Sequence, residues 1–165
     1  MVPVAGSCFG RPGSLGVGAC HPERVTRPAI ELIRLPDLTD RAPYAYAAVA
    51  SDISRLIFTA GACPLDETGQ IAPVGDITGQ TELVIANVTT ALTAAGATLT
   101  DVVKTTVYVA SHDRQDLLAA WNGVRKAFDD HDVPSTLLGV AVLGYPDQLV
   151  EVEAIAALRE PAAST

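Results

Sequence analysis

Two carboxylates, Glu151 and Glu153, interrupt an otherwise apolar run at residues 149–156. Side chains alternate between the two faces of a strand, so this spacing places both carboxylates on one face. A carboxylate buried among apolar groups is costly without a partner, so Glu151 needs a hydrogen-bond donor or water. Such a group can activate water for attack on an electrophilic carbon. The alternative is a structural ion pair with Lys104 or Arg125 across an interface, and Glu153 is predicted to be structural.

Short hydroxyl side chains belong to the strand predicted just before this one. Ser135 and Thr136 could offer hydroxyl and backbone N–H groups to an anion or a carbonyl oxygen. A plain turn after Pro134 is the alternative, and a serine without an adjacent base is not an activated nucleophile. Tyr44 could line a pocket or be a simple edge-strand residue. Cys63 follows the second predicted strand and is expected close to the same region. A reactive role would require a lowered thiol pKa, whereas free cysteines are usually small buried apolar residues.

The elements that must position these residues follow from periodicity. Strand-like runs at 44–50 and 55–61 suggest a hairpin through 51–54. Helical spacing predicts a helix over 78–95, ended by Gly96, and a second helix begins at the N-cap Asp113. A strand over 101–110 and two C-terminal strands complete the order β-β-α-β-α-β-β. In the strand at 101–110, four side chains are predicted to face the helices: Val103, Thr105, Val107 and Val109.

Two helices can cover only one face of such a sheet. Val150, Val152, Ala154 and Ala156 suit the helix-covered face, and Glu151, Glu153 and Ile155 point the other way together with Lys104, Thr106 and Tyr108. A mixed polar and apolar face usually meets another subunit or a ligand. We therefore expect an oligomer whose site lies between subunits.

Composition narrows the classes of function. The 165-residue chain carries a formal net charge of -8, which disfavours a nucleic-acid partner, and it has no apolar run long enough for a membrane span. Three widely spaced cysteines form neither a disulfide framework nor a metal motif, so a cytoplasmic location and no cofactor are expected. Residues 1–28 are predicted to be a flexible extension, 29–160 a single domain and 161–165 a tail.

Several short segments resemble one known family in order and spacing. They are Pro43-Tyr44-Ala45, Thr59-Ala60-Gly61, Pro64-Leu65-Asp66, Gly75-Asp76-Ile77, the run from Asp101 to Val109 and the run from Val150 to Ala156. From residue 43 to residue 158 the sequence is therefore similar to the Rid (reactive intermediate deaminase, YjgF-type) family. The resemblance implies a chorismate-mutase-like α+β fold, with a single sheet, two helices on one face and a homotrimeric barrel with three clefts between subunits.

Archetypal members of this family hydrolyse imines and enamines without a metal. In them an arginine grips the substrate carboxylate with its planar fork, while a glutamate and nearby hydroxyls position water. Matched residue by residue, the glutamate falls on Glu151 and a pocket tyrosine on Tyr44. The arginine falls on Ser135, a serine falls on Ala60 and an asparagine falls on Trp121, and one extra residue lies within 144–147. The predicted substrate-binding set is thus Tyr44, Ala60, Trp121, Ser135, Thr136, Leu137 and Tyr145.

These matches predict a Rid-type cleft without its carboxylate clamp. Loss of a bidentate arginine contact costs about 2–3 kcal/mol in binding a carboxylate. We therefore expect a small-molecule hydrolase or deaminase for an imine, enamine or related metabolite, with weak or no activity on archetypal 2-imino acids. The alternative is a non-catalytic trimer that binds a metabolite or serves a pathway partner.

Overall fold

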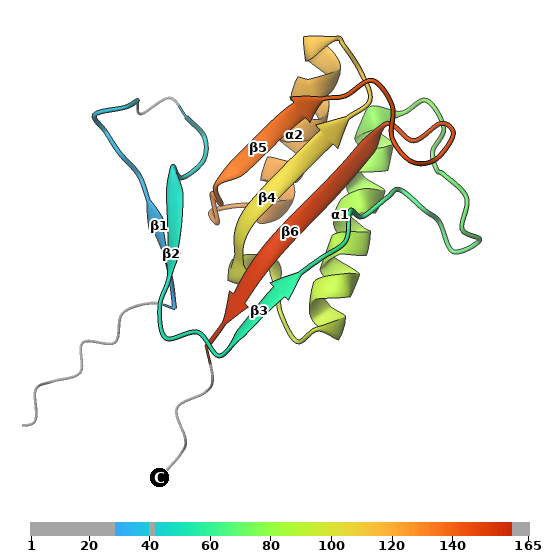
Figure 1. Cartoon of the computed structure of the whole chain (residues 1–165). Helices are drawn as coiled ribbons and strands as arrows, with labels where there is room; N and C mark the ends of the chain where they lie inside the picture. The colour runs from blue at the N-terminus through green and yellow to red at the C-terminus, as the bar shows by residue number, and fades with distance from the viewer. Residues whose placement is uncertain (1–28, 40–41, 160–165) are drawn as a thin grey trace, which may run out of the picture.

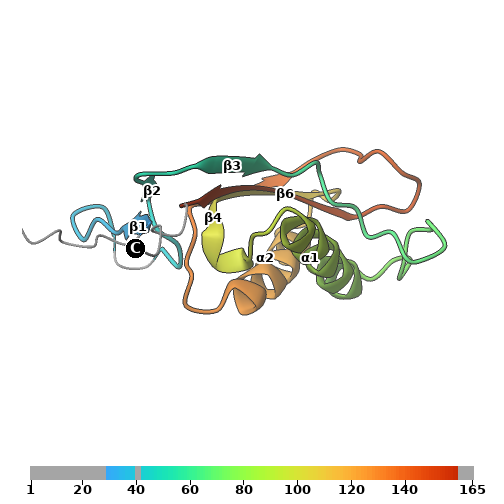
Figure 2. The ribbon, with the colours of Figure 1, turned by 90° about the horizontal axis from the view of Figure 1, so that it is seen from below.

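A computed structural model describes residues 29–39 and 42–159. Two layers make up most of it: a four-stranded sheet, and two helices that lie side by side on one face of that sheet (Figures 1 and 2). The predicted extension at 1–28 and the predicted tail at 161–165 lie outside the described residues. No helix in the described part of the chain is both long and apolar enough to cross a membrane. The elements are β1 (Ile30–Ile33), β2 (Ala47–Ala50), β3 (Arg55–Phe58), α1 (Ile77–Ala94), a 3-10 turn (Leu99–Asp101), β4 (Val102–Val109), α2 (Arg114–Phe128), β5 (Ser135–Gly139) and β6 (Val150–Leu158).

The large sheet has the strand order β3-β6-β4-β5. The β4 and β5 strands run parallel, joined through α2, and the other neighbours are antiparallel. The α+β class, with both helices on one face, is confirmed.

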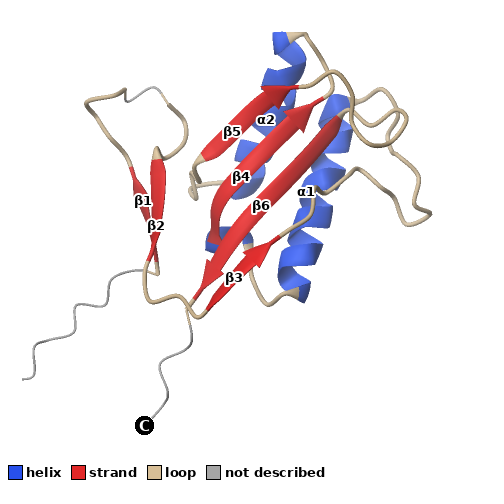
Figure 3. Ribbon diagram, viewed as in Figure 1, coloured by secondary structure: helices blue, strands red, loops and turns tan. Residues whose placement is uncertain are grey.

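The prediction that residues 44–50 and 55–61 form a hairpin within a single sheet is wrong. The β2 strand pairs with β1 in a separate two-stranded sheet, and β3 pairs with β6 (Figure 3). The turn at 51–54, where Asp52 has a φ of 54°, carries the chain from one sheet to the other. Alternating apolar residues favour a strand but do not select its partner, so the sequence pattern could not separate these pairings.

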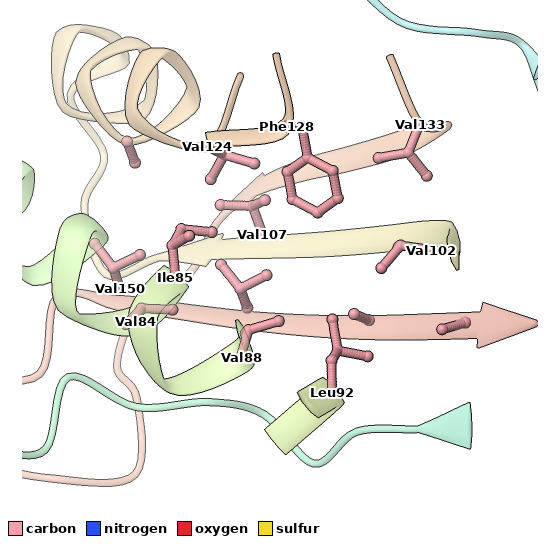
Figure 4. Packing of buried hydrophobic residues seen from close by; sticks show 14 of the residues in the cluster. Val84, Ile85, Val88, Leu92, Val102, Val107, Val124, Phe128, Val133 and Val150 are labelled. Carbon is pink, nitrogen blue, oxygen red and sulfur yellow. The ribbon is translucent and has the colours of Figure 1, made fainter. Parts of the chain in front are cut away.

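Aliphatic side chains fill the space between the helices and the sheet. Val84, Val88 and Leu92 of α1 and Val124 and Phe128 of α2 pack onto the buried side chains of β4 and β6 (Figure 4). In β6, Val150, Val152, Ala154 and Ala156 are buried and alternate with half-buried side chains, as predicted.

The β4 strand departs from strict alternation near its start. A register shift between residues 102 and 104 puts Val102 in the core, where Val103 was expected. A β-bulge inserts one extra residue and thereby reverses the alternation on one side of it. Beyond the bulge, Thr105, Val107 and Val109 are buried as predicted.

Both helices begin at the residues that their sequences indicate. The Asp76 carboxylate accepts a hydrogen bond from Gly79 N at 3.0 Å, and Asp113 accepts from Gln115 N at 2.9 Å. These caps satisfy N–H groups that the first turn leaves unpaired. Gly96, with a φ of 81°, follows α1 and allows the chain to turn away.

The sheet face opposite the helices is left open within one chain. It carries polar and apolar side chains together, and Phe58 and Leu138 on it are 69% and 43% exposed. Lys104, Thr106 and Tyr108 lie on this face of β4, as Glu151 and Glu153 do on β6, which confirms the predicted division between the two faces.

Candidate functional site

Glu151 lies near the start of β6 on the open face of the sheet. After β3 the chain continues beside β6, where Ala62 and Val152 exchange backbone hydrogen bonds of 2.9 and 3.2 Å. This pairing brings Gly61 against the Glu151 side chain. A Cβ atom at position 61 would lie 2.0 Å from Glu151 Oε1, so the absence of a side chain there makes room for the carboxylate.

The two oxygens of the Glu151 carboxylate have different surroundings. Gln148 Nε2 donates to Oε2 at 2.9 Å, and the Cys63 thiol lies 3.6 Å from the same oxygen. Gln148 is only 3% exposed, and its own Oε1 accepts from Tyr145 N at 3.1 Å. The amide therefore holds Oε2 in one orientation, while Oε1, beside Gly61, has no hydrogen bond to any of the described residues.

The Cys63 thiol is not an activated nucleophile. Burial, together with the negative charge of Glu151 and a hydrogen bond to it, raises the pKa of Cys63 above its ordinary value. The thiol stays protonated in the neutral range and donates to the carboxylate. The structure thus supports the usual interpretation of this cysteine as a half-buried, non-nucleophilic residue.

Helix α1 anchors both loops that surround Glu151. Asn87 Nδ2 donates to the carbonyl oxygens of Cys63 and Leu65 at 2.9 and 3.1 Å. Gln80, fully buried, donates to the carbonyls of Pro73 and Asp147 and accepts from Leu149 N at 2.8 Å. These side-chain bonds fix the segment at 63–73 and the loop before β6 relative to one rigid helix.

A second group of predicted residues lies around a cleft of about 540 Å³. Tyr44, Ser135 and Thr136 line it, together with Tyr46 and Lys104. The cleft runs between the chain at 44–48, which includes the start of β2, and the first residues of β4 and β5. Lys104 pairs with Ile155, four residues along β6 from Glu151, so Lys104 lies about 13 Å from Glu151 along the strands within one chain. Ser135 and Thr136 lie on β5, which β4 separates from β6.

Ser135 and Thr136 have different roles in this cleft. The Ser135 hydroxyl is engaged inside the chain, at 2.6 Å from Thr105 Oγ1 and 3.0 Å from the carbonyl of Val133. The Thr136 hydroxyl is on the open side and accepts from Lys104 Nζ at 2.6 Å. Of the two, Thr136 is therefore the hydroxyl that the structure places beside a charged group.

The remaining predicted residues are dispersed. Trp121 packs edge-on against Tyr44, with ring centroids 6.0 Å apart, and so supports the tyrosine from the helix side. Leu137 packs against the core, and Ala60 is exposed beside Gly61. Tyr145 is 48% exposed in the loop at 144–149, on a separate cleft of about 440 Å³ that Gln148 also lines.

Tyr108 and Glu153 form a further polar pair on the open face. Tyr108 hydroxyl donates to Glu153 Oε2 at 3.0 Å, and this bond, with partial burial and the charge of Glu153, raises the pKa of Tyr108. The pairing gives Glu153 a structural partner within the chain, which fits its predicted structural role.

Sequence reasoning missed Gln148, Gln80 and Lys104 as members of the site. Gln80 occupies the apolar stripe of α1, four residues before Val84, and an amide in such a stripe is a signal of a buried hydrogen-bonding role. Gln148 lies three residues before Glu151, but no periodicity marks it. Lys104 was identified only as a possible ion-pair partner.

Comparisons with known proteins agree with this geometry. Residues 37–158 match the family model described as Endoribonuclease L-PSP. A RutC family protein of Pyrococcus abyssi is 41% identical over 122 residues, which span 72% of this chain and 92% of the relative. The 3-aminoacrylate deaminase RutC of Acinetobacter baylyi is 30% identical over 115 residues, 70% of this chain and 86% of the relative.

Solved structures agree as well. The Rid-family protein YyfB of Yersinia pestis, described as of unknown function, superposes with a TM-score of 0.74 at 28% identity, over 79% of this chain and 100% of that protein. The family-model match at residues 37–158 covers both the Glu151 loops and the Tyr44 cleft. The chain therefore belongs to the Rid family of YjgF-type proteins.

Proposed function

We propose that this protein is a small-molecule hydrolase or deaminase that acts on the C=N bond of an imine, an enamine or a related metabolite. The carrying observation is the Glu151 carboxylate, which is half-buried on an apolar strand with Oε2 held by Gln148 and Oε1 turned toward Gly61. The deaminase name of the RutC relative supports this class of reaction. The net charge of -8 disfavours a nucleic-acid substrate.

The proposed reaction needs one water and one base. Glu151 Oε1 accepts a proton from water as the water oxygen bonds to the imine carbon. The C=N π electrons move to nitrogen, which takes that proton from Glu151 and so restores the carboxylate. The resulting carbinolamine loses ammonia as the hydroxyl oxygen forms the carbonyl, and the proton passes through the carboxylate to the leaving nitrogen. An enamine first takes a proton on carbon to become the imine. A positioned general base contributes about 10²–10⁴-fold to such a step.

The proposed site lies between subunits of a homotrimer. Within one chain, Lys104 of this cleft lies about 13 Å from Glu151 along the strands, and Ser135 and Thr136 lie on β5, which β4 separates from β6. One chain alone therefore does not bring Glu151 into the cleft. The open, partly apolar sheet face supports assembly with further copies.

Archetypal 2-imino acids are proposed to be poor substrates. The position matched to the carboxylate-binding arginine holds Ser135, whose hydroxyl is bonded to Thr105 and Val133. A site without the bidentate clamp discriminates less strongly in favour of a carboxylate.

The test replaces Glu151 by Gln and assays ammonia release from imines generated in situ, both 2-imino acids and neutral imines. Loss of about 10²-fold or more in kcat, with the oligomer intact, is expected for Glu151→Gln. Glu153→Gln, on the same strand and face, is the matched control and should retain most activity. Equal turnover by wild type and Glu151→Gln would remove Glu151 from the mechanism, and fast turnover of 2-iminobutanoate would contradict the proposed specificity.

A second candidate is a non-catalytic trimer that binds a metabolite. The separation of Glu151 from the Tyr44 cleft within one chain favours it, because the cleft could bind a ligand without the carboxylate. In that case Glu151→Gln leaves ligand binding unchanged and no imine is hydrolysed faster than in buffer.

A further inference from the structure

Among the described residues that line the cleft beside Tyr44, one side chain is charged, that of Lys104. The other residues that line the cleft, at 44–48, 103 and 134–136, are neutral. Two of them, Tyr44 and Tyr46, are aromatic. The cleft therefore combines a single cation with flat apolar surface and hydroxyl groups.

The Lys104 ammonium is bonded only to neutral oxygens in the described part of the chain. Nζ donates to Thr136 Oγ1 at 2.6 Å and to the carbonyl of Thr105 at 3.0 Å. Among residues 29–39 and 42–159, no Asp or Glu oxygen lies within 4.0 Å of Nζ. The ammonium is half-buried, and this partial burial lowers the pKa of Lys104 below its ordinary value.

A partly desolvated cation without a carboxylate partner is costly to keep. Proteins offset that cost with a counter-charge, and the carboxylate that lies nearest on the same face by strand register, that of Glu153, makes no ion pair with Lys104. Glu153 lies beside Thr106 in the register and accepts from the Tyr108 hydroxyl at 3.0 Å. The Lys104 charge is thus left for a group that is not part of the described chain.

The walls of the cleft fit a small organic ligand. Tyr44 is held by edge-on contacts with Trp121 at 6.0 Å and Tyr46 at 6.2 Å, so its ring has a defined orientation. About 540 Å³ is enough for a molecule of metabolite size.

We infer that Lys104 is the anion-binding residue of this cleft, and that it holds the carboxylate or phosphate group of a small organic ligand whose apolar part lies along Tyr44 and Tyr46. The Thr136 hydroxyl, which already meets Nζ, supplies a further polar contact. This inference deepens the proposed function and rests on it in one respect: the ligand is taken to be the substrate of the same cleft.

An ammonium and an arginine fork differ as anion receptors. The guanidinium matches a planar carboxylate with two parallel bonds, whereas an ammonium is a point charge that accepts planar and tetrahedral anions alike. A lysine receptor therefore broadens the ligand class and lowers selectivity for a carboxylate, which agrees with the proposed poor use of archetypal 2-imino acids.

The test measures binding rather than turnover, so that it stands apart from the test of Glu151. Pyruvate, acetate and inorganic phosphate are titrated into the uniformly ¹⁵N-labelled full chain, and amide shifts are followed at Thr105, Thr136 and Tyr44. Wild type is compared with Lys104→Met, Lys104→Arg and Glu151→Gln, and circular dichroism verifies the fold of each variant.

At least one probe is expected to bind wild type and Glu151→Gln saturably, with shifts confined to the cleft. Lys104→Met should weaken that binding about tenfold to hundredfold, because a charge-assisted contact is lost. Lys104→Arg should restore most of it. If Glu151→Gln still binds the probe but has lost turnover, both proposals are supported. If wild type binds the probe but has no turnover, the anion site is supported and catalysis is refuted.

Two results would overturn the inference. One is the absence of saturable binding of all three probes to wild type; the other is equal binding by wild type and Lys104→Met. The rival explanation, an ion pair between Lys104 and Glu153 of another copy, predicts that Lys104→Met and Glu153→Gln lower the oligomer mass alike while wild type binds no probe.

Discussion

Neighbouring residues fix the orientation of the Glu151 carboxylate. Gln148 and Cys63 both contact Oε2, and the absence of a side chain at Gly61 makes room for the Glu151 side chain, with Oε1 as its nearest atom. Gln148 is therefore a positioning residue: it touches the carboxylate, while the carboxylate is proposed to touch the reacting water. A carboxylate held in one orientation loses less freedom in the reaction than a freely rotating one.

Replacement of Gln148 by Met removes the donor to Oε2 at nearly constant volume. Loss of this bond to a charged group should lower the free energy of unfolding by about 1–3 kcal/mol. In a double-mutant cycle with Glu151→Met, measured by urea unfolding, the two changes should be coupled by about 1 kcal/mol or more. If Glu151 is catalytic, Gln148→Met should also lower kcat more than it changes KM. Strict additivity in the cycle would contradict the positioning role.

The raised pKa of Cys63 predicts a pH-dependent reactivity. Because burial and Glu151 favour the protonated thiol, the thiolate fraction of wild type stays small until well into the alkaline range. Glu151→Gln removes the negative charge, which lowers the pKa of Cys63 and should speed iodoacetamide alkylation severalfold near pH 8. Rates are measured against pH in a background with Cys8→Ser and Cys20→Ser. Glu153→Gln should leave the rate unchanged, because the carboxylate that it removes contacts Tyr108 and not Cys63. If Glu151→Gln reacted at the same rate as wild type, the charge of Glu151 would not act on the thiol.

Among the elements, helix α1 does more than cover the sheet. Its apolar side chains fill the core, while Gln80 and Asn87 extend from it to the two loops that flank Glu151. The loop at 144–149 precedes β6 and supplies Gln148, so its position sets that of the amide. A buried glutamine with all its polar atoms satisfied gives these loops a defined conformation.

Replacement of Gln80 by Met tests this anchoring. The change keeps the volume but leaves the Leu149 N–H and two carbonyls without their partner, which should destabilise the protein by about 1–3 kcal/mol. Faster amide exchange is expected in the 144–149 loop, as measured by hydrogen–deuterium exchange. Glu82→Ala, exposed two residues along the same helix, should change stability by less than about 0.5 kcal/mol. Equal effects of the two substitutions would show that Gln80 does not hold the loop.

The molecule as a whole has one covered and one open sheet face. The helices cover one side, and the other presents Phe58 and Leu138 among half-buried polar residues. Exposed apolar area of this kind on a mixed face is typical of an interface between subunits. We expect that assembly covers it and brings Glu151 of one copy to the Tyr44 cleft of another.

A charge on this face should prevent assembly. Phe58→Glu places a carboxylate where an aromatic ring is 69% exposed in one chain, and burial of that charge in an interface is costly. Sedimentation is expected to give three times the mass of one chain for wild type and a smaller mass for the variant. Leu118→Glu, on an exposed position of α2 outside the open face, is the control and should assemble normally. A monomeric wild type, or an oligomer unaffected by Phe58→Glu, would refute the interface.

Local patterns in the chain were sufficient for both helices, for the strands from β2 to β6 and for the family, whereas β1 was not predicted. The spacing of Val84, Val88 and Leu92 predicts α1 to within one residue at each end, and alternation at 150–156 predicts which face of β6 is buried. These signals are readable because helix and strand periods act within a few residues. The same alternation placed Glu151 on the open face.

Contacts between distant segments could not be obtained in that way. The pairing of β2 with β1, the bulge that buries Val102, and the meeting of Glu151 with Cys63, 88 residues away, depend on strand register and loop course. Register is a property of the packed sheet, since a shift by one residue turns every side chain to the other face. The sequence therefore identifies Glu151 as a candidate, whereas its orientation by Gln148 and the unpaired charge of Lys104 among the described residues emerge only when β4, β5 and β6 pack together.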